Sequence, residues 1–310
     1  MEFGRLEKLA GVDFVLPADP LANQAALARW AQVRTEAGVA LLGLSGWSEK
    51  EYVGSLYPQR TLARDFLSHY GRIFASNELN STYYGIARER TERWAAAVPD
   101  SFRFCPKLSR EITHDCGLRH VDEWMERFVE AAAGFGLKSG RVWGLMPESF
   151  GPDQGRVLEE FVLRWADQLP LAIELRHPAW FADERARERA LACFEEHDVA
   201  AILTDVAGRR DVLHMRLTSQ DMMLRFVGNS LHPTDLTRLD AWVERIVSWL
   251  DAGLRTAYVF FHQKQGPQAV ELARHFAMQF EKRTGIELLP ELAGGASPGA
   301  SANQLELFPG

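Results

Sequence analysis

Short apolar runs alternate with longer amphipathic segments along most of this chain. Eight of the runs have the length and composition of buried strands, and the residues between them suffice to form helices. They cover residues 39–47, 72–80, 102–107, 141–150, 171–177, 199–205, 221–228 and 256–263. Strands that alternate with helices indicate a parallel sheet. About eight such units predict an α/β fold closed into a (β/α)8 barrel of the TIM type.

The segments between the runs have helical patterns. In residues 236–253, Leu239, Trp242, Ile246 and Trp249 recur at helical spacing and form one apolar stripe. Gly253 follows them in the position of a C-terminal cap. Similar patterns occur in residues 91–98, 122–136 and 155–169. The helices predicted here would cover the outside of the sheet.

The chain divides into three regions. Residues 1–38 form an N-terminal extension that packs on the barrel, and its helix at 22–38 is expected to close the bottom of the barrel. Residues 39–290 are expected to form the barrel itself. Residues 291–310 include the Gly-, Ala-, Ser- and Pro-rich stretch "GGASPGASANQ", which predicts a flexible tail.

Composition excludes several classes of protein. The formal net charge is -7, which argues against a wholly electrostatic nucleic-acid binder. No apolar run approaches the roughly 20 residues of a membrane helix, and the first residues lack the pattern of a signal peptide. Three cysteines, Cys105, Cys116 and Cys193, have no metal-type spacing. We therefore expect a cytoplasmic protein with reduced thiols and no membrane partner.

Polar side chains recur at the carboxyl ends of the predicted strands, where barrel enzymes place their sites. Side chains alternate along a strand, so Glu78 and Asn80 share the inward face of one strand, and Glu174 and Arg176 share that of another. The other polar or aromatic residues at strand ends are Ser45, Trp47, Lys107, Asp205, Arg225 and His262. Charges gathered in one cavity cost desolvation energy that packing alone does not require. The pattern therefore predicts a functional site at this end.

The residue types allow more than one chemistry. Glu78 and Glu174 suit an acid–base pair with separated pKa values, although Glu174 and Arg176 also suit a structural ion pair. Lys107, Arg176 and Arg225 suit a phosphate or carboxylate group. Aromatic rings that could stack on a sugar or a base are those of Trp47, Tyr83, Tyr84 and Trp180.

A divalent metal has little support. Glu78, Glu174 and Asp205, with His262 or His114, contain the oxygen and imidazole ligands that a hard metal prefers. No H-E-x-x-H or C-x-x-C motif accompanies them, nor does any nucleotide-binding glycine motif. The cofactor is therefore left open.

With these residues in view, the sequence resembles the YecE-like family, known as domain of unknown function 72, up to about residue 285. The resemblance rests on "GLSGW" at 43–47, "ELNSTYY" at 78–84, "FRFCPK" at 102–107, "ITH" at 112–114, "IELRHPAWF" at 173–181, "LTDVAGRRDVLHMRLT" at 203–218 and "RFVGNSLHPTD" at 225–235. It implies a TIM-type barrel and no established reaction. The shared residues fall on Glu78, Asn80, Ser81, Lys107, His114, Glu174, Arg176, His177 and Asp205.

Two positions depart from the family pattern. Leu145 stands where the family usually has glutamine, so a contact made by that glutamine would be missing here. His262 stands where many relatives carry asparagine, which marks a subgroup.

Two classes of function fit these observations, and a third remains. The first is a lyase, isomerase or hydrolase that binds a small anionic or sugar-phosphate-like ligand at the barrel mouth. Its expected catalytic residues are Glu78, Glu174, Asp205 and His114. Its expected ligand-binding residues are Trp47, Asn80, Ser81, Tyr83, Lys107, Arg176, His177, Arg225 and His262. The second is a role at DNA, with nucleic acid at the mouth; the third is a binding protein without turnover.

The role at DNA follows from the sequence "QLELF" near the end of the chain. It resembles the peptide by which bacterial replication and repair proteins bind the sliding clamp. Gln304 can hydrogen-bond the edge of a groove, while Leu305, Leu307 and Phe308 supply apolar anchors. A flexible linker over 294–303 has an r.m.s. reach of about 17 Å, which suffices to present the motif clear of the barrel. The tail therefore predicts the sliding clamp as a partner.

Overall fold

A computed structural model describes residues 4–293 of the 310-residue chain. Each of the eight predicted apolar runs contains a strand, and the run at 199–205 contains two short ones. The strands are β1 Val39–Leu44, β2 Ser76–Leu79, β3 Arg103–Pro106, β4 Val142–Leu145, β5 Leu171–Glu174, β6 Ala200–Ala201, β7 Leu203–Asp205, β8 Asp221–Val227 and β9 Thr256–His262. They form two parallel sheets, of order β3-β2-β1-β9-β8-β7 and β4-β5-β6.

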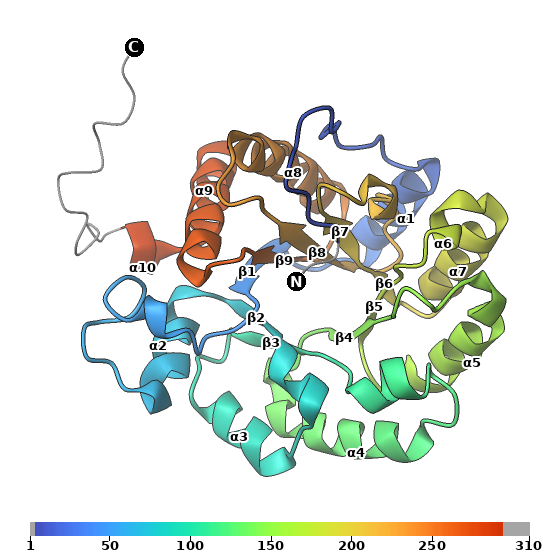
Figure 1. The fold of residues 1–310 in the computed structure, drawn as a ribbon, viewed down its shortest axis with the longest axis horizontal. Helices are drawn as coiled ribbons and strands as arrows, with labels where there is room; N and C mark the ends of the chain where they lie inside the picture. Colours follow the sequence, from blue (N-terminus) through green and yellow to red (C-terminus); the bar gives the residue numbers. More distant parts are fainter. Residues whose placement is uncertain (1–3, 294–310) are drawn as a thin grey trace.

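The edges of the two sheets are connected at two places. Between β3 and β4, isolated parallel bridges join Phe104 to Ser139 and Lys107 to Trp143. Between β6 and β7 only Ile202 intervenes, and its backbone N–H donates to the carbonyl of Ile173 on β5. Figure 1 shows the strands in the middle of the molecule and the helices outside them.

Most of the described helices have buried apolar side chains. They are α1 Leu21–Val33, α2 Phe66–Ile73, α3 Arg88–Ala96, α4 Asp122–Ala132, α5 Gly155–Trp165, α6 Ala179–Ala182, α7 Glu184–Glu196, α8 Pro233–Ala252, α9 Gly266–Thr284 and α10 Pro290–Ala293. The stripe predicted on α8 is buried, including Trp242 and Trp249. Gly253 ends the helix with a φ of 134°, a conformation that side chains rarely adopt. None of the described helices is long and apolar enough to cross a membrane.

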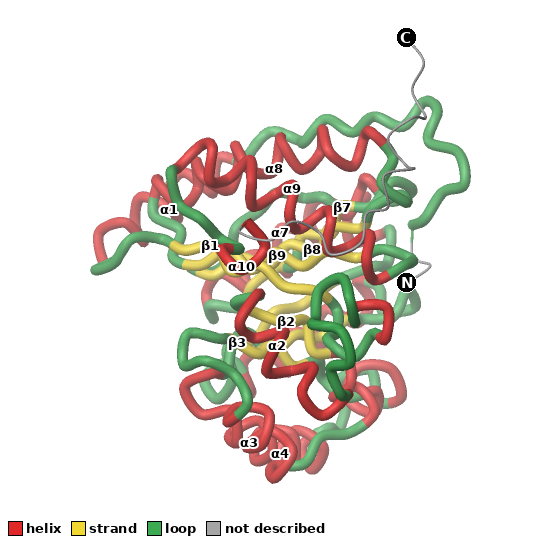
Figure 2. Tube along the Cα trace, turned by 90° about the vertical axis from the view of Figure 1, so that its left-hand side faces the viewer, coloured by secondary structure: helices red, strands yellow, loops and turns green. Residues whose placement is uncertain are grey.

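The N-terminal residues reach both ends of the strands. Helix α1 lies at their amino ends (Figure 2). There Asn23 hydrogen-bonds the backbone of Met215 and Leu217 ahead of β8. The segment before α1 lies at the carboxyl ends instead: the Gly4 carbonyl accepts a hydrogen bond from Gly208, which follows β7. The helix predicted over 22–38 is present but ends at Val33, and the segment before it lies beside the predicted site.

Candidate functional site

Two buried glutamates and one buried arginine form the centre of the candidate site. Glu78 on β2 and Glu174 at the end of β5 are almost completely buried, as is Arg225 on β8. Arg225 makes a two-pronged ion pair with Glu78, with Nε 2.9 Å from Oε2 and Nη2 3.1 Å from Oε1. Its third nitrogen, Nη1, lies 2.5 Å from Glu174 Oε2. Alternation along the strands, together with the position of these residues at strand ends, predicts this convergence.

Three further side chains complete the hydrogen bonds of the carboxylates. His262 Nε2 lies 2.8 Å from Glu78 Oε2, and Asn80 donates to Glu78 Oε1 at 3.0 Å. Arg176 Nε donates to the remaining oxygen, Glu174 Oε1, at 2.6 Å. All four carboxylate oxygens are therefore engaged. His262, which departs from the resembled family's pattern, is part of this cluster.

The charges of the cluster keep both glutamates ionised. Burial alone would raise the pKa of Glu78, but Arg225 and His262 outweigh it and hold that pKa well below its usual range. Burial likewise opposes ionisation of Glu174, and Arg225 and Arg176 lower its pKa overall. Two carboxylates that are both shifted downward do not form an acid–base pair with separated pKa values. The structure favours the structural ion pair for Glu174 and Arg176.

Lys107 lies beside this cluster, directly after β3. Its Nζ lies 4.4 Å from the ring centroid of Tyr83 and 4.8 Å from that of Trp143, so the ammonium contacts two aromatic rings. Within residues 4–293, no carboxylate lies at ion-pair distance from this Nζ. Burial, and then the charge of Arg225, lower the pKa of Lys107 to about 8.

Trp143 is a member of the cluster that the sequence does not single out. Its side chain is fully buried, and Arg225 also lies over its ring, at 4.8 Å. Its Nε1 has no hydrogen-bond partner within the described chain. The bridge that pairs Trp143 with Lys107 places both side chains together, and this pairing of neighbouring strands is not readable from one strand alone.

His114 approaches the same aromatic group from another segment. It lies in a π-helical turn, Glu111–Asp115, and such turns often occur at functional sites. Its ring packs edge-on against Tyr83 at 5.4 Å, and its Nδ1 lies 2.8 Å from the Thr113 hydroxyl. Burial, followed by the charge of Lys107, lowers the pKa of His114, so the imidazole is neutral at physiological pH.

Counted over the described residues, the cluster has an excess of positive charge. The two ionised glutamates are balanced by the guanidinium groups of Arg225 and Arg176. Protonated Lys107 adds one positive charge, and none of the carboxylates in the described part of the chain lies at ion-pair distance from it. An anion that approaches the strand ends near Lys107 is therefore attracted rather than repelled.

Three predicted ligand-binding residues have other surroundings. Trp47 packs edge-on against Trp94, at 5.4 Å between ring centroids. Ser81 is exposed at the surface. His177 Nδ1 accepts a hydrogen bond from the Ala179 amide at the start of α6. These contacts agree with packing and local capping roles, and they do not place the three side chains against the two glutamates.

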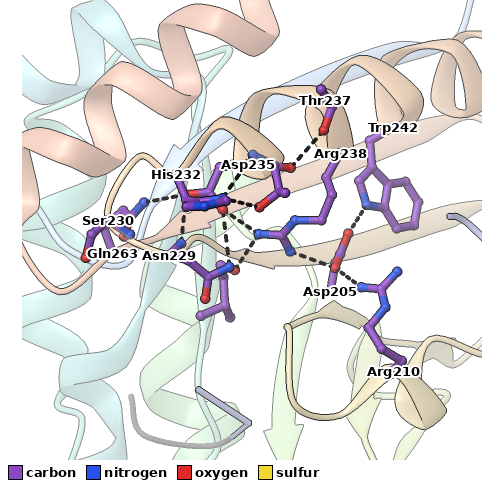
Figure 3. A network of polar contacts seen from close by, with 12 residues as sticks. Asp205, Arg210, Asn229, Ser230, His232, Asp235, Thr237, Arg238, Trp242 and Gln263 are labelled. Atoms are coloured by element: carbon purple, nitrogen blue, oxygen red, sulfur yellow. Dashed lines mark hydrogen bonds and ion pairs between the residues drawn. The ribbon is translucent and has the colours of Figure 1, made fainter. Parts of the chain in front are cut away.

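Asp205 lies apart from the cluster, and this corrects the expected convergence. In the strand register Thr204 pairs with Arg225, whereas Asp205 pairs with Phe226, so the Asp205 side chain points toward the helices. Its carboxylate accepts from Arg238 at 2.8 Å and from Trp242 at 2.7 Å, and it also pairs with Arg210 (Figure 3).

The Asp205 network connects α8, the carboxyl end of β7 and the N-terminal segment. Arg238 on α8 also pairs with Asp235 at 2.8 Å. Its guanidinium lies 5.0 Å from the ring centroid of Phe14, which belongs to the segment before α1. The arrangement holds that segment beside the strand ends.

The residues considered for a metal do not form a ligand set. Across residues 4–293, no group of three His, Cys, Asp or Glu side chains is arranged to hold a metal ion. The oxygens of Glu78 and Glu174 are already bonded to Arg225, Arg176, His262 and Asn80. The geometry suits binding of an anion better than binding of a cation.

Comparison with known proteins identifies relatives along most of the chain. Residues 41–294 match the family model "Protein of unknown function DUF72". The UPF0759 protein YecE of Escherichia coli K12 is 28% identical over 286 residues, which cover 86% of this chain and 99% of that protein. The protein of the same name in Escherichia coli O157:H7 matches to the same extent.

Solved structures show the same fold. A crystal structure of a DUF72 family protein from Enterococcus faecalis V583 superposes with a TM-score of 0.65 and 20% identity, covering 78% of this chain and 96% of that one. A second crystal structure of it superposes with a TM-score of 0.57 and covers 82% of this chain and all of that one. The match to the family model spans most of the sequence, and the chain is thus a member of the DUF72 family.

Proposed function

We propose that this protein binds a small anionic ligand of the sugar-phosphate type at the carboxyl ends of its strands and acts on it as a lyase, isomerase or hydrolase. The observation that carries the proposal is the unbalanced charge of Lys107 beside a cluster whose other charges are paired. Arg176, with 11% of its side chain exposed, is the second cation at the edge of the cluster. The charges lie among the strand ends, which favours a small ligand over a nucleic-acid backbone.

The architecture that supports this site is, in our proposal, a closed (β/α)8 barrel. The bridges from β3 to β4 and the continuity of β6 with β7 connect the two sheets at both pairs of edges. Such a ring would bring the carboxyl ends of all strands to one face, where barrel enzymes hold their substrates.

Thermal shift with sulfate and phosphate tests the anion site. We expect Lys107→Met to weaken anion binding by at least about tenfold, since it removes the unbalanced charge, and Arg176→Met to weaken it as well. Glu174→Gln should strengthen it, because one carboxylate is neutralised. The melting temperature of each variant is measured with and without the anion at equal ionic strength, and only the difference is compared between variants. The stability of each variant without the anion therefore does not affect the comparison.

Exposed Lys282, at the end of α9, provides the matched control. Lys282→Met makes the same change of charge away from the cluster, and its response to sulfate should equal that of the wild type. Sulfate also stabilises proteins generally by exclusion from their surface. If the wild type and all variants respond equally to sulfate, the response is only this general effect, and the proposal of an anion site is contradicted.

A second proposal, based on sequence, is recruitment to the bacterial sliding clamp in the cytoplasm. Gln304, Leu305, Leu307 and Phe308 lie outside the described residues, so the motif itself carries the proposal. We expect a 302–310 peptide to bind a bacterial clamp with a Kd on the order of micromolar, a usual strength for one short motif. The Leu307→Ala, Phe308→Ala peptide should not bind in fluorescence polarisation. Equal binding by both peptides, or none by either, would contradict this proposal and leave the anion site unaffected.

A further inference from the structure

Lys107 is held rigidly at the edge of the candidate site. Its backbone N–H donates to the Leu79 carbonyl, with N and O 3.1 Å apart. The same backbone nitrogen lies 2.9 Å from the hydroxyl oxygen of Thr82. The Thr82 hydroxyl in turn donates to the Lys107 carbonyl at 2.8 Å. The side chain then runs between Tyr83 and Trp143. The position of the amine is thus fixed by two neighbouring segments, as a reacting group requires.

The amine of Lys107 differs from the other charged groups of the cluster in its contacts. Glu78, Glu174 and Arg225 are tied to one another by ion pairs of 2.5–3.1 Å. Nζ of Lys107 contacts aromatic faces instead, and the cation next to it is Arg225, which disfavours the protonated form. A lysine that is desolvated, or placed next to another cation, is the kind that enzymes use as an amine nucleophile.

We propose that Lys107 forms a covalent imine with the carbonyl carbon of an anionic aldehyde or ketone bound at the strand ends. The inference rests on the proposed anion site and names the chemical class of its ligand. Arg176 would hold the anionic group, and Trp143 Nε1, a buried donor without a partner in the described chain, would supply a hydrogen bond to an oxygen of the ligand. The pKa of about 8 leaves roughly a quarter of the amine unprotonated half a pH unit lower.

The step balances without a further reactant. The free amine attacks the carbonyl carbon, a C–N bond forms, and the C=O π bond breaks as one amine proton moves to the oxygen. One further proton then converts the hydroxyl into water, which leaves and gives the protonated imine. That proton equals the one lost when the ammonium became an amine. Neutral His114, which packs on the same Tyr83 ring, is placed to take and return it.

The surrounding charges suit the product. A protonated imine carries the same single positive charge as the ammonium that it replaces, so the cluster needs no rearrangement. Glu78 and Glu174 remain ionised and attract that charge, as they attract the ammonium. The site thus favours the iminium over the neutral carbonyl adduct, which is the condition for subsequent bond cleavage or isomerisation.

Reductive trapping tests the inference on the full-length chain. Glycolaldehyde phosphate serves as the anionic probe, uncharged glycolaldehyde as its matched control, and cyanoborohydride reduces any imine to a stable secondary amine. Peptide mass spectrometry then compares Lys107 with the other five lysines of the chain. Lys138 is the internal reference: its side chain is 15% exposed, but it pairs with Asp100 and donates to two carbonyls.

We expect Lys107 to be labelled at least about tenfold faster than the other lysines with the anionic probe. The preference should shrink with uncharged glycolaldehyde, inorganic sulfate should protect Lys107, and the rate should rise with pH toward 8. Lys107→Arg should keep a stabilising response to sulfate and lose the label. If that variant does not fold, the labelling of Lys107 in the wild type and its protection by sulfate still test whether Lys107 reacts at the anion site.

The outcomes separate the imine from the anion site. Labelling spread evenly over all six lysines, or an unlabelled Lys107 in a protein that sulfate stabilises, would overturn the imine and leave the anion site standing. No stabilisation by sulfate together with selective labelling that sulfate does not affect would overturn the anion site, and with it the anionic class of ligand proposed here.

Discussion

Replacement of Arg225 by methionine is expected to destabilise the protein by about 3–5 kcal/mol at neutral pH. Arg225 is buried and pairs with both Glu78 and Glu174, so the variant leaves two buried carboxylates with too little compensating charge. Chemical denaturation at several pH values measures the loss. Arg283→Met is the control, because the pair of Arg283 with Glu244 is more than half exposed and should contribute less than about 1 kcal/mol.

The pH dependence of this loss has a definite sign. In the wild type both glutamates have lowered pKa values, so their ionised forms stabilise the folded state above the ordinary pKa of glutamate. This stability is lost as the pH falls from the ordinary pKa through the lowered pKa of the folded state. In Arg225→Met, burial acts without the guanidinium and raises both pKa values, so the folded variant gains from protonation. The gap between the two proteins should narrow toward pH 4. A gap that is constant, or a loss near that of the control, would contradict the proposed role of Arg225.

Asp205→Ala is expected to cause a loss of similar size, about 3–5 kcal/mol. Asp205 is fully buried. Its removal leaves the Trp242 Nε1 without an acceptor and takes away one of the two carboxylates that balance the buried charge of Arg238. The segment around Phe14, which packs on Arg238, should also become more accessible to proteases. Urea denaturation and limited proteolysis measure the two effects. The control is Asp251→Ala, at an exposed position near the end of α8.

The Asp205 variants also separate a structural role from a catalytic one. Asp205→Asn keeps an acceptor for Trp242 and nearly the same shape, so it should lose less stability than Asp205→Ala. Because Asp205 points away from Glu78 and Glu174, the response of Asp205→Asn to sulfate should equal that of the wild type. If Asp205→Asn is as stable as the wild type but no longer responds to sulfate, Asp205 belongs to the ligand site after all.

The positions of the strands and much of the ion-pair cluster are readable from the sequence. Every predicted apolar run contains a strand, because continuous burial requires such runs in a parallel sheet. Alternation within a strand correctly groups Glu78 with Asn80, and Glu174 with Arg176. These are local consequences of a period of two residues.

Position at the end of a strand was a wrong guide for Asp205, and no pattern in the sequence singled out Trp143. A strand of three residues, Leu203–Asp205, contains too little pattern to fix which face is inward, and only its register with β8 decides this. Trp143 reads as an ordinary core residue until its bridge to Lys107 is known. The depressed pKa values of the glutamates also depend on partners far along the chain: 147 residues separate Glu78 from Arg225.

The sequence by itself determines where the strands and the longer helices lie along the chain, although not their bounds, since apolar periodicity and capping residues act over a few positions. It also determines the family, through long ordered motifs. Only the tertiary structure decides the chemistry of the site, because ion pairing and burial set protonation, and both join residues from different strands. The same glutamates that look like an acid–base pair in the sequence are both ionised in the structure, because guanidinium groups pair with them. Lys107 is the residue that we propose to react.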